Sequence, residues 1–206
     1  MNSRTYQLQG RLVDRVATEE KVVALTFDDG PTERTPEVLR MLDELKVPAT
    51  FYLIGESLAA HPEYGAAIAA AGHEIGNHSY THRRMVLISG DTVREEIERT
   101  DTEIRRTGFA GPITFRPPYG KKLWALPHYL AEHDRTTVTW DVEPDSAGGA
   151  SRETIVGDAL AQTRPGSIIL LHVMQGTESA AAVPDIVNGL RAQGYRFVTV
   201  SDLLAR

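Results

Sequence analysis

The most informative absence in this sequence is cysteine, which does not occur once in 206 residues. Without thiols the chain forms no disulfide, no iron–sulfur cluster and no cysteine nucleophile, and it offers no thiolate to a metal. Any metal site must therefore be built from imidazole, carboxylate and carbonyl ligands. The chain has seven histidines and 28 acidic residues from which to build one.

Long apolar runs are missing as well. No stretch approaches the roughly 20 residues that a transmembrane helix needs, so we expect no membrane span. The start of the chain, MNSRTYQLQG, carries no apolar core of a secretory signal. Two interpretations stay open: a cytoplasmic protein that begins at Met1, or a chain from which a signal segment has been removed.

The chain also has no excess of positive charge. The chain has 22 Lys and Arg against 28 Asp and Glu, which gives a formal net charge of −6. An acidic surface repels phosphate backbones, so we expect no nucleic-acid partner. Hydrophobic residues at 41% and charged residues at 24% are typical of a folded globular chain.

The length suits one domain over residues 1–206, with residues 1–20 as an N-terminal extension. Short β-branched or aromatic runs predict seven strands, at residues 22–27, 49–54, 73–76, 113–115, 136–140, 167–171 and 197–200. Helical patterns lie between them, at residues 37–46, 57–71, 91–107, 152–163, 184–193 and 201–205. Thr35 and Ser151 are the expected N-caps of the first and fourth of these helices. This alternation predicts either an α/β barrel of parallel strands or a doubly wound sheet.

Chemically active side chains follow five of the predicted strands directly. They are Asp28 and Asp29, His78 and His82, Arg116, the acidic segment 141–145, and His172. The carboxyl ends of parallel strands emerge on one face of an α/β fold, where active sites lie. We therefore expect these groups to meet in one site.

A metal centre is the first expectation for this site. His78 and His82 are four residues apart, and Asp29 would complete a set of three ligands that leaves positions open for water and substrate. Zn²⁺ suits this set, as do Fe²⁺, Co²⁺ and Ni²⁺. An isolated pair of histidines at this spacing is more often a surface or core feature, but the strand-end carboxylate favours a ligand set.

Asp28 is the candidate general base, because an adjacent carboxylate that does not bind the metal can take a proton from water. Taken alone, Asp-Asp-Gly-Pro is typical of a turn, and its place after an apolar strand is what favours catalysis. Arg116 would hold Asp28 through charge-assisted hydrogen bonds. Two prolines follow Arg116, so the first free N–H belongs to Tyr119, which could donate to an oxyanion.

His172 ends the most apolar predicted strand and is the candidate general acid, with a nearby carboxylate to tune it. A lone histidine in such a place is otherwise a structural residue. Trp140 and Tyr119 stand at strand ends, where they could stack on a sugar, although large aromatic residues are more often part of the core.

Four motifs together resemble those of the NodB-homology polysaccharide deacetylases, carbohydrate esterase family 4. They are TFDDGP at 26–31, HSYTH at 78–82, RPPYG at 116–120 and Leu171-His172, in the family's order and spacing. The resemblance extends over about residues 20–204. It implies a distorted (β/α) barrel of about seven parallel strands. It also implies a divalent metal, and hydrolysis of N-acetyl or sometimes O-acetyl groups on a carbohydrate polymer such as peptidoglycan or a chitin-like glycan. It points to the cell envelope or a secreted protein.

The resemblance also implies a role for each matching residue. These roles are catalytic base for Asp28, metal ligands for Asp29, His78 and His82, tether of the base for Arg116, oxyanion-binding backbone for Tyr119, acid for His172 and lining of the acetyl pocket for Leu171.

The sequence departs from the family pattern at the fourth motif, typically Asp-x-x-Asp-Trp. Ser146 and Ala147 occupy the usual Asp-Trp positions. We expect Asp145 to orient His172 instead; the alternative is that this support is weakened. The groove tryptophan is also missing, which leaves the polymer-binding surface undefined.

Basic residues follow two of the motifs, namely Arg83, Arg84, Lys121 and Lys122. These residues could bind an anionic glycan. The alternative, that they are four solvated surface charges, has at least equal weight. Two further functions are carried as alternatives: a deacylase or deformylase of a small or lipid-linked amide or an O-acetyl glycan, and a non-catalytic sugar-binding domain that keeps its metal. The oligomeric state is left open.

Overall fold

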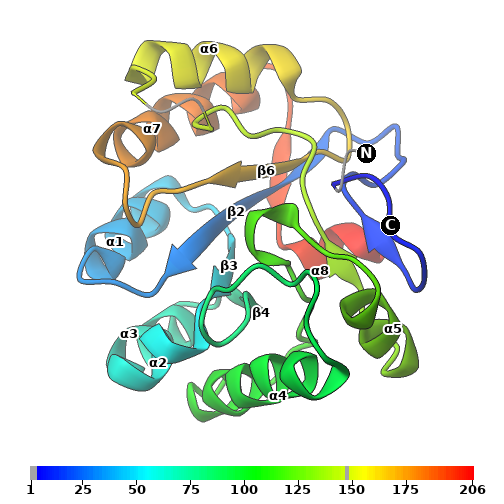
Figure 1. Ribbon diagram of the computed structural model, residues 1–206. Coiled ribbons are helices and arrows are strands. Elements are labelled where there is room, and N and C mark those ends of the chain that lie inside the picture. Colours follow the sequence, from blue (N-terminus) through cyan, green and yellow to red (C-terminus); the bar gives the residue numbers. More distant parts are fainter. Residues whose placement is uncertain (1–3, 147–148) are drawn as a thin grey trace.

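A sheet of five parallel strands organises the fold, which the computed structural model describes for residues 4–146 and 149–206 (Figure 1). The central strand β2 (Val22–Gly30) pairs with β3 (Thr50–Leu53), β6 (Ile168–Leu171) and β7 (Arg196–Val198). Strand β4 (Glu74–Asn77) pairs with β3 on the far side. All four pairings are parallel, as expected for nearly continuous apolar strands.

Isolated β-bridges extend the parallel pairing beyond β4 and connect it back to β6. Phe115 bridges Asn77 of β4 and Thr137 of β5 (Thr137–Val138), and Val142 bridges Ile169 of β6, all in parallel. The strands therefore follow one another around a distorted barrel, which confirms the predicted parallel α/β architecture.

The predicted strand 113–115 was wrong as a strand, because only Phe115 takes part in pairing. Proline precedes it at position 112 and follows it at positions 117 and 118. A proline has no N–H to give to a ladder, so the pairing cannot extend beyond this point.

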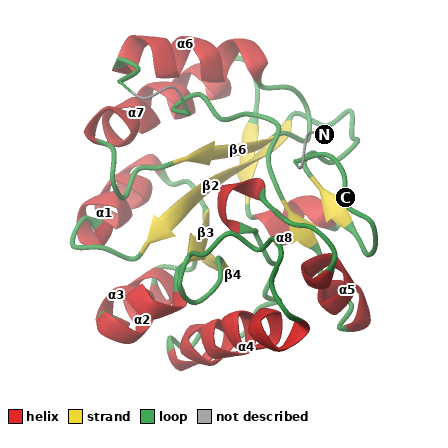
Figure 2. Ribbon diagram, viewed as in Figure 1, coloured by secondary structure: helices red, strands yellow, loops and turns green. Residues whose placement is uncertain are grey.

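Helices surround the strands on the outside of the fold, except the last helix, which packs through Val200 and Leu203 against a buried cluster on the inner face of the strands (Figure 2). They are α1 (Thr35–Leu45), α2 (Gly55–Ala60), α3 (Pro62–Ala70), α4 (Gly90–Arg106), α5 (Ala125–Glu132), α6 (Arg152–Gln162), α7 (Thr177–Ala192) and α8 (Val200–Leu204), with a 3₁₀ turn, η1, at Pro118–Gly120. None of the helices in the described part of the chain is long and apolar enough to cross a membrane.

Proline accounts for the helices that differ from the sequence prediction. The predicted helix 57–71 is two helices, because α3 begins at Pro62, a first-turn position where its missing N–H costs nothing. The unpredicted α5 also has a proline, Pro127, in its first turn. In contrast, α7 starts well before Pro184 and continues through it. The alanine-rich segment ahead of this proline has a high helix propensity.

The two predicted caps had different outcomes. Ser151 caps α6 by accepting a hydrogen bond from the backbone N–H of Thr154, as predicted. Thr35 is instead the first residue of α1, and its hydroxyl accepts from the N–H of Thr32 in the preceding turn. The Thr35 hydroxyl therefore stabilises the turn before α1 and does not cap the helix.

Side-chain alternation along the strands separates two cores. In β2, Val23, Leu25 and Phe27 pack outward against the helices, while Val22 and Ala24 belong to a second cluster on the other face. The same period of two operates in β6, where Ile169 and Leu171 face the helices and Ile168 and Leu170 face the opposite way. The inner face is the one that leads to the pocket described below.

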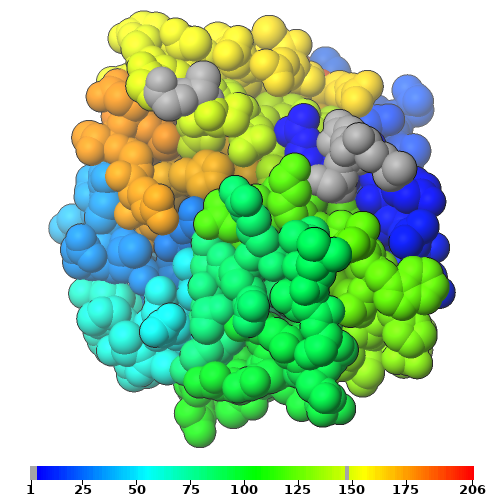
Figure 3. Space-filling model, in the orientation of Figure 1, coloured from blue at the N-terminus to red at the C-terminus, as the bar shows by residue number. Residues whose placement is uncertain are grey.

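The N-terminal segment contributes a strand that the sequence did not predict. β1 (Leu12–Val13) pairs in parallel with β5. Ahead of it, Gln9 Oε1 lies 3.0 Å from His128 Nδ1 on α5. In the space-filling view this segment, coloured blue, lies beside α5 (Figure 3).

Candidate active site

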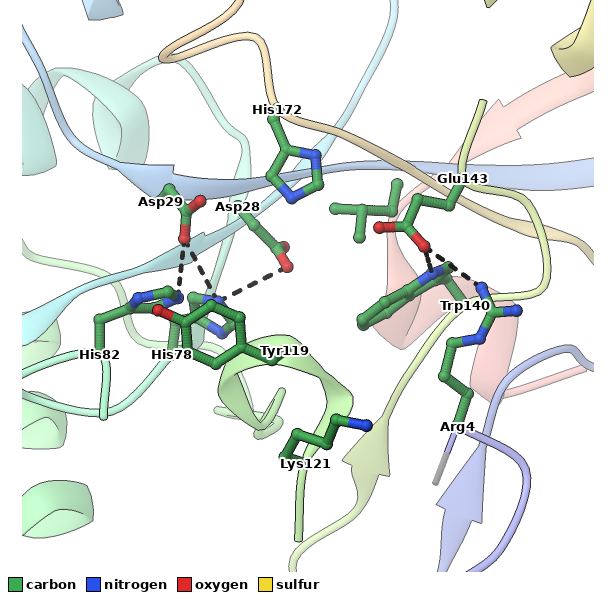
Figure 4. A pocket seen from close by; sticks show the side chains of 11 residues that line it. Arg4, Asp28, Asp29, His78, His82, Tyr119, Lys121, Trp140, Glu143 and His172 are labelled. Atoms are coloured by element: carbon green, nitrogen blue, oxygen red, sulfur yellow. Dashed lines mark hydrogen bonds and ion pairs between the residues drawn. The ribbon is translucent and has the colours of Figure 1, made fainter. Parts of the chain in front are cut away.

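A pocket of about 410 Å³ opens at the carboxyl ends of the strands (Figure 4). Its lining consists of Arg4, Asp28, Asp29, His78, His82, Tyr119, Lys121, Trp140, Glu143, Leu170 and His172. The groups that follow separate strands in the sequence thus share one cavity, because parallel strands deliver their carboxyl ends to the same face.

Asp28 and Asp29 both reach this pocket although they are adjacent in a strand, where successive side chains normally point to opposite faces. The register between β2 and β3 shifts between Asp28 and Gly30, and Asp29 has a left-handed φ of 65°. This irregularity turns the second carboxylate back toward the first. Such backbone outliers in non-glycine residues are concentrated at functional sites.

Asp29, His78 and His82 form a cluster whose candidate ligand atoms all lie within 4.8 Å of one another. Asp29 Oδ1 is 3.5 Å from Nε2 of His78 and 3.0 Å from Nε2 of His82. This oxygen is nevertheless buried without a hydrogen-bond partner in the described part of the chain. Three lone-pair donors that converge on one point without bonding to each other fit a shared cation.

The pKa of Asp29 reflects the same arrangement. Burial raises the pKa of this carboxyl, but its contacts with His78 and His82 outweigh burial and lower the pKa far below its ordinary value. The site therefore favours the ionised carboxylate, the form that binds a cation.

The loop after β4 holds the two histidines through its backbone. Asn77 Oδ1 accepts a hydrogen bond from the N–H of Ser79, and the buried carboxylate of Glu96 on α4 accepts from the N–H groups of Tyr80 and Thr81. His82 itself has a left-handed φ of 55°. Sequence reasoning missed Glu96, because nothing in a helical acidic residue signals that it holds a distant loop.

His78 has its orientation set by a second contact. Its Nδ1 lies 2.7 Å from the backbone carbonyl of Arg116. Because a carbonyl only accepts, Nδ1 carries the proton and Nε2 keeps its lone pair toward Asp29. This is the tautomer that a metal ligand requires.

Arg116 and Asp28 lie together at the base of the pocket. Arg116 Nη1 donates to Asp28 Oδ1 at 2.7 Å and to the hydroxyl of Thr26 at 2.8 Å, and Nη2 donates to the carbonyl of Thr139. Arg116 is completely buried. Asp28 Oδ2 is left facing His78, 3.6 Å from its Nε2.

Aromatic rings support the buried guanidinium. The ring of Tyr52 lies 4.0 Å from the guanidinium carbon and that of Trp140 lies 5.4 Å from it. These distances allow cation–π attraction, which is stronger where the cation is desolvated. Burial raises the pKa of Tyr52 above its ordinary value, so the ring stays neutral.

His172 and Asp145 are joined by two contacts. The backbone N–H of His172 donates to Asp145 Oδ2 at 2.7 Å, and the Nδ1 of its ring lies 3.2 Å from Oδ1. Burial lowers the pKa of His172, but Asp145, Asp28 and Asp29 together outweigh this and raise the pKa to about 9. The pKa of Asp145 is lowered in turn, because its contacts with His172 outweigh its burial.

The three carboxylates of the acidic segment 141–145 make different contacts. Asp141 accepts hydrogen bonds from the Ser167 hydroxyl and the Ile168 N–H at the start of β6. Glu143 points into the pocket, and Asp145 contacts His172. Ala147, at the family's tryptophan position, lies outside the described residues.

No sequence signal marked Arg4 as a pocket residue, and Glu143 was expected there only as part of the acidic segment 141–145. Glu143 accepts from the indole N–H of Trp140 at 2.8 Å, and Arg4 Nη1 lies 3.3 Å from the same carboxylate oxygen. The carbonyl of Arg4 accepts from the hydroxyl of Thr139. Arg4 is too far from every motif for the sequence to connect it with the site.

The predicted substrate-binding residues occupy different environments. Tyr119 is 54% exposed at the pocket edge, with its ring 4.8 Å from that of His82, whereas Trp140 is buried and forms a wall. Leu171 does not reach the pocket, since it is fully buried against the helices. The alternation along β6 brings Leu170 to the lining in its place.

The four basic residues near the motifs are also separated by the structure. Lys121 lines the pocket, while Arg84 lies over the Tyr119 ring at 5.3 Å. Burial lowers the pKa of Lys122 to about 8. Arg83 is exposed and does not line the pocket.

The fold and the site together define an α/β enzyme with a two-histidine, one-carboxylate cluster at the carboxyl ends of its strands. A family model described as polysaccharide deacetylase matches residues 15–138. This chain belongs to the polysaccharide deacetylase family and is a hydrolase of the carbohydrate deacetylase class.

Named relatives agree with this assignment. The chain is 37% identical over 185 residues to a peptidoglycan-N-acetylglucosamine deacetylase of Bacillus cereus, covering 88% of this chain and 67% of the relative. It is 36% identical to a bifunctional xylanase/deacetylase of Pseudobutyrivibrio xylanivorans, covering 89% of this chain but 30% of that protein. A solved structure of a peptidoglycan N-acetylglucosamine deacetylase with a bound N-hydroxybenzamide superposes with a TM-score of 0.88 at 35% identity, covering 93% and 92% of the two chains.

Proposed function

We propose that this protein removes N-acetyl groups from an acetylated glycan polymer, with peptidoglycan as the first candidate and a chitin-like glycan as the second. The observation that carries the proposal is the convergence of Asp28, His172 and the Asp29–His78–His82 cluster on one pocket. The names of the relatives support peptidoglycan. On a peptidoglycan substrate the protein would work at the cell envelope.

We infer that Asp29, His78 and His82 hold a divalent cation, with Zn²⁺ as the first candidate. The unpartnered oxygen of Asp29 and the Nε2 lone pair of His78 supply the donor set for it. When bound, the cation acts as a Lewis acid that polarises the acetyl carbonyl and lowers the pKa of water.

Asp28 would act as the general base. Its Oδ1 is occupied by Arg116, so Oδ2, which faces His78, is the atom that accepts a proton from the attacking water. The ion pair with Arg116 keeps the carboxylate in one orientation while it does so.

His172 would act as the general acid. Asp145 engages its Nδ1, which leaves Nε2 to donate a proton to the departing amine nitrogen. The raised pKa keeps this proton in place at neutral pH. The backbone N–H of Tyr119 is the candidate donor to the oxygen of the tetrahedral intermediate.

Acetate release from N-acetylglucosamine oligomers and from peptidoglycan tests the proposal, before and after chelation and after add-back of Zn²⁺. We expect chelation to abolish release and the metal to restore it. N-formyl, lipid-linked amide and O-acetyl glycan substrates are run beside them. Faster turnover of one of these, or acetate release that survives full chelation, would contradict the proposal.

A further inference from the structure

A second hollow lies between α4 and α5, and the catalytic proposal does not use it. It encloses about 510 Å³ and is lined by Gly90, Asp91, Arg94, Trp124, Ala125, His128, Tyr129, Glu132 and His133. The volume exceeds that of the catalytic pocket and is ample for a small polar ligand.

Aromatic rings form one wall of this hollow. Trp124 is 58% exposed, and its ring stacks on His128 with an interplanar angle of 16°. Tyr129 and His133 form a second stack, with ring centroids 4.1 Å apart. Both pairs are spaced four residues apart along α5, so each pair stacks on the surface of one helix. A contiguous group of exposed rings, rather than a single one, is what marks a binding surface.

The hollow opens close to the catalytic pocket. α4 and α5 each follow a segment that begins at the carboxyl end of the barrel strands, so we expect the first turn of each helix to lie toward the catalytic face. Lys121 lines the catalytic pocket, and Trp124 is only three residues further along. Their Cα atoms are therefore no more than roughly 10 Å apart.

The two chain segments that lead to α4 and α5 carry exposed apolar side chains beside exposed basic ones. Leu87 is 90% exposed and Leu123 is 48% exposed, on the two chain segments that lead to α4 and α5. A parallel bridge between Met85 and Lys122 joins these segments, and both bridging residues are buried. Tyr119, Leu123 and Trp124 are the exposed apolar residues of the segment that joins the catalytic pocket to the second hollow.

Two of the three formal charges in the hollow are paired. Asp91 and Arg94 form an ion pair at 2.7 Å, and Glu132 lies 3.4 Å from the imidazole of His128. The hollow therefore offers flat rings and hydrogen-bonding groups, with one formal negative charge in excess. This combination suits a hydroxyl-rich sugar ring, whose apolar C–H face can lie on an indole while its hydroxyls reach the polar groups.

We propose that this hollow is a second glycan-binding site, which holds sugar units of the same polymer beyond the unit that is deacetylated. The inference rests on the proposed function for its ligand class. It also assigns a polymer-binding surface to a chain that lacks the family's groove tryptophan.

Steady-state kinetics on long and short substrates test this site. We expect Trp124→Ala to raise KM for long N-acetylglucosamine oligomers by roughly three- to tenfold, with kcat/KM for the dimer unchanged. Trp124→Phe should restore most of the affinity. Tyr64→Ala is the matched control, because Tyr64 also stacks on a histidine, His61, and lines neither hollow.

Fluorescence gives a readout that does not depend on turnover. The chain has two tryptophans, and Trp140 lines the catalytic pocket, so the signal of Trp124 in chelator-treated protein is the part of the change that Trp124→Phe removes. We expect a long oligomer to produce a smaller change in Trp124→Phe than in the wild-type protein, and a dimer to produce the same change in both. Equal effects of Trp124→Ala on dimer and long oligomers, or no effect on either, would overturn the second site. If the wild-type protein released no acetate from either substrate, the proposed function would fail, and the fluorescence titration would still decide whether the hollow binds glycan.

Discussion

Arg116 and Asp28 form an ion pair that is buried at the base of the catalytic pocket, with Nη1 of the arginine 2.7 Å from Oδ1 of the aspartate. The two residues are 88 positions apart in the chain. Removing one member of a buried pair leaves the other without compensation, so this contact links the stability of the fold to the position of the base.

Asp28→Asn should lower kcat by roughly 10²- to 10⁴-fold, because the variant cannot accept a proton. It should also lower the free energy of unfolding by about 3 kcal/mol, since Arg116 loses its buried counter-ion. Cation affinity should persist, because Asp28 is not in the ligand cluster. Acetate release, urea denaturation and calorimetric Zn²⁺ titration measure the three effects. Unchanged turnover would show that Asp28 is not the base.

Cation binding should stabilise the protein against heat. A ligand that binds only the folded state at 100 times its Kd contributes about 2.7 kcal/mol, which is measurable as a rise in Tm. His82→Ala should remove most of this rise, because it deletes one of the three ligands. His61→Ala is the control, since His61 is exposed and does not line the pocket. Comparable shifts in both variants would argue against the assigned cluster. Co²⁺, Ni²⁺ and Fe²⁺ are compared with Zn²⁺ in the same assay.

The alkaline limb of the kcat–pH profile should report the proton of His172. Its pKa is raised to about 9, so the acid is protonated below that pH and activity falls as pH rises through it. A bound cation offsets the contribution of Asp28 and Asp29 and moves this limb to lower pH. Asp145→Asn should move it further, toward the ordinary histidine value of about 6.5. A limb that stays in place in Asp145→Asn would refute the tuning role of Asp145.

Lys121 should matter for an anionic glycan and not for a neutral one. Of the four basic residues near the motifs, it is the one that lines the catalytic pocket, and it forms no ion pair with any described residue. Lys121→Ala should raise KM for a carboxylate-bearing glycan by roughly tenfold at low salt, and the loss should shrink at high salt. Arg83→Ala, which removes an exposed cation outside the pocket, is the control. Equal KM values on charged and neutral substrates would dismiss the charge preference.

Much of the site could be predicted from sequence because strand ends in a parallel fold share one face. Once apolar runs placed β2, β4 and β6, the polar residues just after them had to converge. His78, His82 and His172 are brought together in this way. Leu171 shows the limit of this reasoning. The family resemblance implied a place for Leu171 in the acetyl pocket, but the side-chain alternation along β6 brings Leu170 to the lining instead.

Other features depended on contacts between distant segments. Arg4 and Glu96 carry no local signal, since one lies in a polar N-terminal stretch and the other on the side of an amphipathic helix. Arg4 contacts Glu143, and Glu96 contacts the backbone of the 78–82 loop. These partners are distant in the sequence and come close only in the folded chain.

The sequence by itself determined the chemistry of this protein: without cysteine, any cation must bind nitrogen and oxygen, and the acids and histidines that can do so follow the strands. The tertiary structure decided which of them act together. The backbone irregularity at Asp29 directs the two neighbouring carboxylates of Asp28 and Asp29 into the same cavity. The contact with Asp145 raises the pKa of His172. Both effects arise from burial and from distances of a few ångströms, and these exist only after the chain has folded.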